Sequence, residues 1–296
     1  MGHRSFLSPL DGYTDMPFRL LCQRYGADSA CVPLVNSTAI SFDSSKISRV
    51  DAHEDEKNLG VQLVGDRPET MGLAAGIIAK KFGFVSWFNI NCGCPSERTM
   101  GSGGGSALLA QPDKIVESVR EVEKTGKPVS VKIRISKKLD DTISLCRLLE
   151  KAGVAFIIIH GRTPQQHYTG KADWEAVKRV KNELGVQVVG NGDLKTAAEG
   201  LKRVKDGYCD SYMVGRAAMT NPMLFSDREP ANLGEKFGLL DEYLTIHREY
   251  VGEPELKDVK LKAMNFVSGA VDAGKLRNSI ARSGTIEKIV ALRDAQ

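Results

Sequence analysis

The chain has 296 residues and a mass of 32.3 kDa, with 42% hydrophobic and 26% charged residues. This composition is typical of a globular protein and excludes collagen, long coiled coils and wholesale disorder. The formal net charge of +4 permits a nucleic-acid partner without requiring one.

Short apolar runs recur along residues 1–225, separated by amphipathic stretches. The runs predict eight strands, at residues 6–10, 29–35, 61–64, 85–90, 129–133, 156–159, 186–189 and 212–214. Several are β-branched without polar alternation, as in parallel strands buried on both faces. Capped helices are expected at 68–81, 112–124, 140–153 and 173–185. The alternation predicts an α/β fold, a (β/α)8 TIM barrel over residues 1–225.

Residues 226–296 lack a convincing strand. Apolar stripes at helical spacing begin at Leu239 and at Leu261, so we expect a small all-α C-terminal domain of three or four helices. Residues 226–256 carry three Lys/Arg and eight Asp/Glu, whereas residues 257–296 carry eight and four. The basic end could be a phosphate-binding surface or simply a solvated helix face.

Polar residues stand at nearly every expected strand end, where the active sites of TIM barrels form. They are Asp11, Gln62, Asn91, Lys132, Arg134, His160, Arg162, Asn191, Asp193 and Arg216. Residues 92–111 also make an unusually long connection between the fourth strand and its helix. The sequence therefore predicts a catalytic site at this end of the barrel.

The last two strands end in glycine-containing motifs, Gly190-Asn-Gly-Asp193 and Gly215-Arg216. Backbone N–H groups approach an anion closely where no Cβ intervenes, so the pair favours a bound phosphate over simple turns. Lys132 would project into the barrel mouth, where a buried ammonium needs an anionic partner. That partner is a phosphate or a reduced flavin ring, or else a carboxylate in an internal salt bridge.

Six cysteines are scattered along the chain. Cys92 and Cys94 are too close for a Cys-x-x-Cys site and no second pair complements them, so we expect no metal. Cys94, followed by the Gly-rich stretch 101–106, is expected to be a thiol exposed on a mobile lid. The remaining four are expected to be buried packing residues: Cys22, Cys31, Cys146 and Cys209.

The chain also gives indications of its compartment. Its longest uninterrupted apolar run is far shorter than the roughly 20 residues that span a bilayer. No apolar stretch follows residues 1–4, so we expect no secretory signal peptide and no membrane association. Because six scattered cysteines are not a disulfide framework, we expect a cytoplasmic protein. The sequence is compatible with a monomer.

Seven motifs follow one another in order through residues 5–225. They are Pro9-Leu-Asp-Gly-Tyr-Thr-Asp15, Gln62-Leu-Val-Gly65, Asn91-Cys-Gly-Cys-Pro95 with 103–109 after it, Lys132-Ile-Arg134, His160-Gly-Arg-Thr163, Gly190-Asn-Gly-Asp193 and Gly215-Arg216. Together they resemble the tRNA-dihydrouridine synthases. Cys92 stands where many of these enzymes have Met or Val.

The resemblance implies an FMN-dependent oxidoreductase that reduces the C5–C6 bond of uridines in tRNA with NADPH or NADH. It implies a flavin-ring site of Pro9, Leu10, Asp11, Gln62, Lys132 and His160. It implies a phosphate site of Asn191, Gly192, Asp193, Gly215 and Arg216. Asn91, Arg134 and Arg162 would hold the uracil or nearby RNA, and Cys94 would be the general acid.

The implied chemistry is physically consistent. Hydride passes from flavin N5 to uracil C6, and the Cys94 thiol gives a proton to C5. Cationic side chains stabilise the charge that develops on the ring. The uridine must leave its base stack to reach the flavin. A basic helical tail would bind RNA phosphates without recognising the base sequence.

Two alternatives remain open. A flavin barrel acting on a free pyrimidine, like dihydroorotate dehydrogenase, would not need residues 226–296, so deleting them should leave it active. A non-catalytic RNA-binding protein with a vestigial flavin site would be unaffected by Cys94→Ala.

Overall fold

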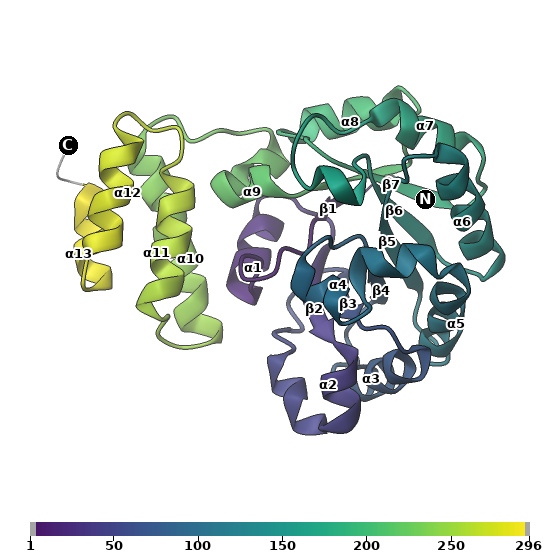
Figure 1. Ribbon diagram of the computed structural model, residues 1–296. Coiled ribbons are helices and arrows are strands. Elements are labelled where there is room, and N and C mark those ends of the chain that lie inside the picture. Colours follow the sequence, from purple (N-terminus) through teal and green to yellow (C-terminus); the bar gives the residue numbers. More distant parts are fainter. Residues whose placement is uncertain (1–3, 294–296) are drawn as a thin grey trace.

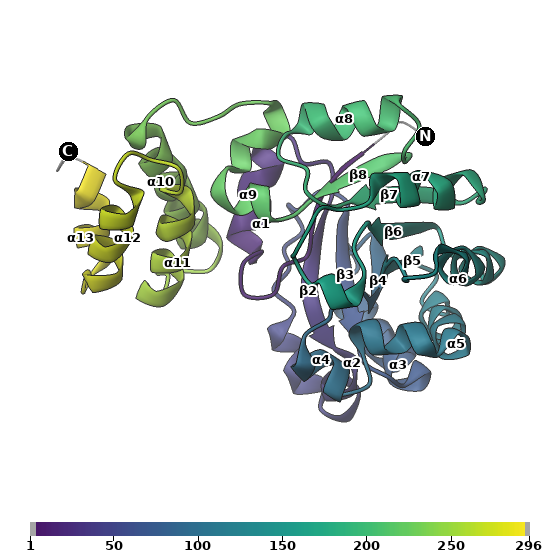
Figure 2. The same ribbon diagram turned by 45° about the horizontal axis from the view of Figure 1, so that its top comes forward.

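Eight parallel strands form the barrel in the computed structural model, which describes residues 4–293 (Figures 1 and 2). The strands are β1 (Ser5–Leu7), β2 (Ala30–Asn36), β3 (Leu59–Val64), β4 (Trp87–Cys92), β5 (Val129–Arg134), β6 (Phe156–His160), β7 (Gln187–Asn191) and β8 (Ser211–Val214). Their order is β1-β8-β7-β6-β5-β4-β3-β2, and a parallel bridge between Phe6 and Ser29 joins β1 to β2. The predicted (β/α)8 barrel is confirmed. Residues 1–3, where we expected no signal peptide, and the last three residues lie outside the described part.

Helices follow the strands around the barrel. They are α1 (Met16–Arg24), α2 (Ser37–Phe42), α3 (Pro68–Lys81), α5 (Pro112–Glu123), α6 (Leu139–Lys151), α7 (Trp174–Asn182), α8 (Ala197–Lys205) and α9 (Arg216–Thr220). The four expected helices are present. The (β/α)8 prediction implied further helices such as α1 and α8 without giving their bounds. Asp15 and Thr196 cap these two by accepting hydrogen bonds from the N–H groups of Phe18 and Glu199.

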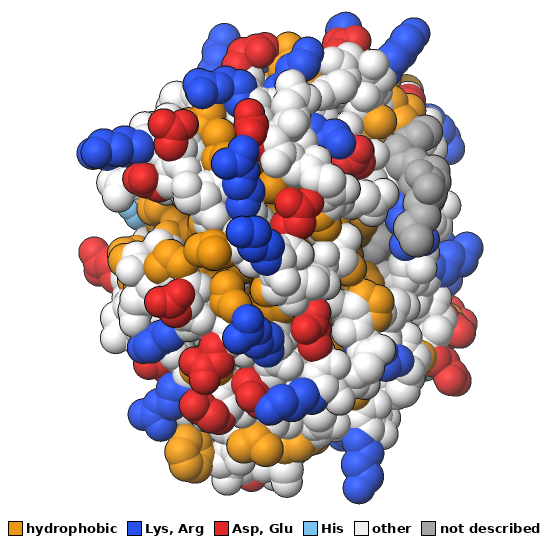
Figure 3. Space-filling view, turned by 90° about the vertical axis from the view of Figure 1, so that its right-hand side faces the viewer, with side chains coloured by type: hydrophobic (Ala, Val, Ile, Leu, Met, Phe, Trp, Pro, Cys, Tyr) orange, Lys and Arg blue, Asp and Glu red, His pale blue; other side chains and the backbone are white. Residues whose placement is uncertain are grey.

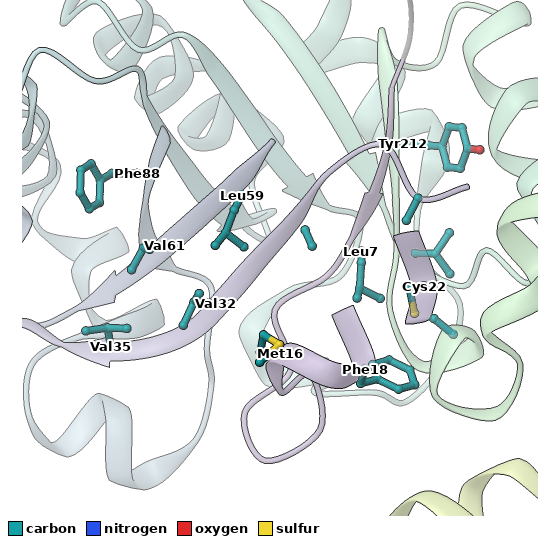
Figure 4. Close-up of a cluster of buried hydrophobic side chains, with 14 of the residues drawn as sticks. Leu7, Met16, Phe18, Cys22, Val32, Val35, Leu59, Val61, Phe88 and Tyr212 are labelled. Atoms are coloured by element: carbon teal, nitrogen blue, oxygen red, sulfur yellow. The ribbon is translucent and has the colours of Figure 1, made fainter. Parts of the chain in front are cut away.

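Successive side chains along each strand point alternately toward the barrel axis and toward the surrounding helices. One set faces the barrel axis and forms an apolar plug: Phe6, Cys31, Trp87, Ile158, Val189 and Met213. Residues of the same parity nearer the strand ends are polar. The other set packs outward against helices, and Figure 4 shows part of that core, in which Leu7 of β1 lies near Met16, Phe18 and Cys22 of α1.

Strand register brings the polar residues together. Asn91 of β4 is level with Lys132 of β5, and Arg134 of β5 with His160 of β6. His160 is level in turn with Asn191 of β7. Strand β1 ends at Leu7, earlier than expected, so Pro9, Leu10 and Asp11 belong to the loop that follows it.

Four helices follow the barrel: α10 (Leu233–Tyr250), α11 (Leu256–Phe266), α12 (Ala273–Arg282) and α13 (Ile286–Val290). Residues 226–293 contain no strand, as expected. Helices α1 and α9 lie between these helices and the strands (Figure 1). Phe18 of α1 stacks on Phe266 of α11 at 6.4 Å between ring centroids.

The surface away from these four helices mixes positive and negative side chains with apolar ones (Figure 3). No helix within residues 4–293 is both long enough and apolar enough to cross a membrane.

Candidate active site

A cavity of about 1420 Å³ opens at the carboxyl ends of the strands. We call it the mouth cavity. Its lining includes every expected site residue: Pro9, Leu10, Asp11, Gln62, Asn91, Cys94, Lys132, Arg134, His160, Arg162, Asn191, Gly192, Asp193, Gly215 and Arg216. The tertiary structure thus brings together residues spread over most of the barrel sequence.

A chain of buried amide and hydroxyl groups links the neighbouring strands β3, β4 and β5 at the mouth cavity. Asn89 Nδ2 donates to Ser130 Oγ at 2.8 Å, and Gln62 Nε2 donates to Asn89 Oδ1 at 2.7 Å. Asn91 Nδ2 donates to Gln62 Oε1 at 2.8 Å. Ser130 was not singled out from the sequence, and Asn89 was noted at the end of its strand without being assigned to the site. The chain fixes the amide orientations of Gln62 and Asn91.

Asn91 also sets the position of Cys94. Its Oδ1 accepts hydrogen bonds from the backbone N–H of Cys94 at 2.9 Å and of Gly93 at 3.1 Å. The Cys94 Sγ, partly exposed, lies 3.4 Å from Ser96 Oγ and 3.6 Å from Thr99 Oγ1. Asn91 was expected to hold substrate, and the structure shows its side chain bonded to the loop that carries the thiol.

The Gly-rich stretch packs beneath Cys94. It joins α4 (Glu97–Gly101) to the 3-10 helix Gly105–Ala110, and residues 104–106 are buried. Ser106 N donates to Cys94 O at 2.9 Å, and a Cβ at Gly105 would lie 2.6 Å from that oxygen. The expectation of an exposed lid is therefore wrong for residues 104–106, where Gly105 is needed for close backbone packing.

Eight Lys and Arg side chains line the mouth cavity against five Asp and Glu, and four of the eight stand at or just past strand ends: Lys132, Arg134, Arg162 and Arg216. Asp193 accepts from two of them, Arg162 Nη2 at 2.7 Å and Arg216 Nη2 at 3.1 Å. Positive charge is therefore in excess among the residues whose side chains meet here.

Lys132 has a polar but uncharged partner. Its Nζ donates to Asn191 Oδ1 at 3.3 Å, and no carboxylate within residues 4–293 forms an ion pair with it. Burial, together with the nearby Arg134, lowers the pKa of Lys132 to about 8. The alternative of an internal salt bridge is contradicted, and the ammonium group is left facing the mouth cavity.

His160 is held neutral. Burial lowers its pKa to about 2, with Lys132 and the neighbouring arginines acting in the same direction. Its Nε2 lies 3.4 Å from Arg162 Nη1. The imidazole therefore offers hydrogen-bonding and packing groups without charge.

Arg134 and Arg162 brace the loop after β6. Arg134 donates to the carbonyl oxygens of Gly93 at 3.0 Å and His167 at 2.7 Å. Arg162, 2% exposed, donates to the carbonyl oxygens of Thr169 and Gly170. Both were expected to bind uracil or RNA, and most of their donors are engaged with the protein itself.

Tyr168, at the tip of the same loop, also lines the mouth cavity. The guanidinium carbons of Arg134 and Arg216 lie 5.6 and 4.5 Å from its ring centroid. Tyr168 was not predicted from the sequence. Its position in the long connection after the sixth strand could have indicated that it lines the site.

The expected phosphate site has the required backbone. Gly192 has a φ of 131°, and a Cβ there would lie 2.5 Å from the Cβ of Ala172. A Cβ on Gly215 would meet nothing closer than 3.6 Å, the Ser8 Cβ. Because both carboxylate oxygens of Asp193 accept from arginines, this residue offers an anion its backbone rather than its side chain.

The other thiols lie apart from the cavity. Cys22, Cys31, Cys146 and Cys209 are buried, as expected, and Cys92 is buried too. Within the described residues, no three His, Cys, Asp or Glu side chains gather as metal ligands would.

Comparison with known proteins gives a consistent result. The family model described as "Dihydrouridine synthase (Dus)" matches residues 6–281. A probable tRNA-dihydrouridine synthase from Aquifex aeolicus is 29% identical over 294 residues, 96% of this chain and 93% of that protein. A tRNA-dihydrouridine synthase B from Pasteurella multocida is 33% identical over 228 residues, 75% of this chain and 68% of that protein.

Solved structures share the fold. An amine oxidase from Pseudomonas geniculata N1 matches with a TM-score of 0.59 at 14% identity, over 90% of this chain and 53% of that one. An old yellow enzyme homologue from Zymomonas mobilis matches with a TM-score of 0.53 at 12% identity, over 74% of this chain and 86% of that one. At these identities the likeness concerns the fold alone.

Proposed function

Since the chain belongs to the dihydrouridine synthase family, we propose that it is an oxidoreductase that reduces uridine in tRNA to 5,6-dihydrouridine, with FMN as its cofactor and NADPH or NADH as the reductant. The single observation that carries the proposal is the mouth cavity. In it one loop thiol, Cys94, faces a cluster of cations that lacks sufficient counter-charge.

The residues of the mouth cavity fit FMN. The ribityl phosphate would lie against Gly192, Gly215 and Arg216, where the glycine backbone and a guanidinium group are available. The ring would lie between the loop of Pro9, Leu10 and Asp11 and the side chains of Gln62, Lys132 and His160. Lys132, which has no carboxylate partner within residues 4–293, matches an electron-rich ring.

When bound, reduced FMN supplies the hydride for uracil C6. Cys94 holds the proton for C5, and Asn91 orients the backbone of the thiol loop through two hydrogen bonds. Arg134 and Lys132 stabilise negative charge that develops on the uracil. Because His160 is neutral, the proton is assigned to Cys94.

The helical residues 226–296 form a second domain that binds tRNA in this proposal. Eight Lys/Arg against four Asp/Glu in residues 257–296 suit contacts with phosphates. A cytoplasmic location suits the six unpaired thiols.

The test is nucleoside mass spectrometry of dihydrouridine-free tRNA incubated with the protein, FMN and NADPH, beside Cys94→Ala. Dihydrouridine is expected from the wild type and little from the variant. FMN that binds and is reduced without dihydrouridine appearing would contradict tRNA as the substrate and redirect the search to free pyrimidines. Equal product from both proteins would contradict the role of Cys94.

A further inference from the structure

The loop between β1 and α1, residues 8–15, has two faces. One face lines the mouth cavity through Ser8, Pro9, Leu10, Asp11 and Tyr13. The opposite face is turned to the C-terminal helices, which Figure 2 shows beside α1. Whatever fixes this loop therefore fixes the wall of the cofactor site.

The loop closes on itself only in part. Thr14 Oγ1 accepts from Leu10 N at 3.0 Å, and the N–H groups of Tyr13 and Thr14 donate to Leu10 O at 2.9 and 3.0 Å. From α1, Arg19 Nη1 donates to Thr14 O at 2.7 Å. These bonds leave the Tyr13 carbonyl and one carboxylate oxygen of Asp15 for other partners.

Both partners come from the C-terminal helices. Lys262 of α11 donates to Tyr13 O, and its Nζ lies 3.1 Å from Asp15 Oδ2. Tyr243 of α10 donates its hydroxyl to the same Asp15 oxygen at 2.9 Å. Asp15 meanwhile caps α1 with its other oxygen, which accepts from Phe18 N at 3.1 Å. One carboxylate thus joins the start of α1 to two helices more than 200 residues away in the chain.

This junction is buried and closely packed. Lys262 is 3% exposed and Tyr243 is fully buried. The Lys262 ammonium group lies 4.8 Å from the ring centroid of Phe18 and 5.3 Å from that of Tyr243. A buried ammonium group is costly unless its donors are matched, and here Asp15, Tyr13 O and two ring faces match them.

We propose that Lys262, assisted by Tyr243, is a positioning residue of the cofactor site: the C-terminal helices hold the loop of Pro9, Leu10 and Asp11 in the conformation that receives the flavin. The proposal rests on the proposed FMN site. It assigns the helical segment a second role besides tRNA binding. Deleting residues 226–296 therefore cannot distinguish a tRNA enzyme from a free-pyrimidine enzyme. The deletion would also remove the helices that support the loop of Pro9, Leu10 and Asp11, and so would weaken FMN binding in either enzyme.

The test measures FMN affinity by quenching of flavin fluorescence, without tRNA or reductant. Lys262→Met keeps the aliphatic stem and removes the charge, and we expect it to raise the FMN Kd about tenfold. Tyr243→Phe removes only the hydroxyl and should raise the Kd about threefold. Lys257→Met, on the same helix but exposed, is the matched control and should leave the Kd unchanged.

Hydrogen exchange of the cofactor-free proteins supplies a second measurement. The amides of Tyr13 and Thr14 should exchange faster in Lys262→Met and Tyr243→Phe than in the wild type, while β5 and β6 keep their protection. The inference would be overturned if Lys262→Met folds and has the same FMN Kd and the same exchange rates at Tyr13 and Thr14 as the wild type. If that variant does not fold, the same pair of results for Tyr243→Phe would overturn it.

The outcomes for the two proposals are distinct. A wild-type protein that binds no FMN contradicts the proposed function, and the exchange of Tyr13 and Thr14 then still decides whether Lys262 holds the loop. A wild-type protein that binds FMN and forms dihydrouridine, beside an unaffected Lys262→Met, contradicts only the inference.

Discussion

Cys92 and Cys94 are two residues apart and lie on opposite sides of the barrel wall. Cys92 is the last residue of β4, fully buried in the core between strands and helices. Cys94 lies past the strand end and lines the mouth cavity. The period of two alone would place both thiols on the same face, and the turn at Gly93, held by Asn91, moves Cys94 inward.

Alanine at each position should therefore give opposite results. Cys94→Ala should lower dihydrouridine formation by a factor of about 10² to 10⁴, the range for loss of a general acid, with unchanged FMN affinity. Cys92→Ala should keep the activity and lower the free energy of unfolding by about 1 kcal/mol, because it removes a buried group. Urea denaturation and single-turnover assays on both variants check this. A Cys92→Ala variant as inactive as Cys94→Ala would contradict the assignment.

Binding of FMN should depend on pH through Lys132. With a pKa of about 8 in the free protein, the ammonium loses its proton as pH rises through 8, and an anionic ligand favours the protonated form. The FMN Kd should therefore rise about tenfold between pH 7 and pH 9. Lys132→Met should bind weakly with little change over this range. If the FMN Kd changed equally with pH in the wild type and in Lys132→Met, Lys132 would be excluded as the titrating group.

Stability in mild acid should depend on His160. The pKa of His160 is about 2 in the folded protein, against an ordinary value of 6.5. Below pH 6.5 the imidazole is therefore protonated in the unfolded chain and remains neutral in the folded protein. The stabilisation is present above pH 6.5 and is lost as pH falls, by about 1.4 kcal/mol per pH unit from this residue. His160→Gln should show a shallower decline of the unfolding free energy between pH 7 and pH 5. Identical slopes would mean that His160 is protonated in the folded state.

Gly192 should resist substitution for two reasons. Its φ of 131° is rare for L residues, and a Cβ would lie 2.5 Å from Ala172 Cβ and 3.1 Å from the His160 ring. Gly192→Ala should cost on the order of 3 kcal/mol of stability and raise the FMN Kd at least tenfold. Gly207→Ala is the control, with a φ of 75° and open space around it. It should cost about 1 kcal/mol and leave FMN binding unchanged. Equal FMN affinities for the two variants would argue against phosphate binding at Gly192.

The sequence by itself determined the eight-strand barrel, the helical end and fifteen of the residues that line the mouth cavity. Local rules suffice for the barrel and its polar mouth: buried parallel strands are continuous apolar runs, and TIM barrels place polar strand ends at one mouth. The remaining site residues came from the motifs that resemble the tRNA-dihydrouridine synthases. Every site residue expected from the motifs lines that cavity.

Only the tertiary structure decided what each of these residues contacts. Asn91 bonds to the thiol loop, and Arg162 donates to loop carbonyls and to Asp193. In the described part of the chain, Lys132 has no carboxylate partner. Lys262 bonds to Tyr13 in the loop between β1 and α1, 249 residues away in the chain. Such partners depend on strand register and on packing between distant helices, which local sequence periodicity does not encode.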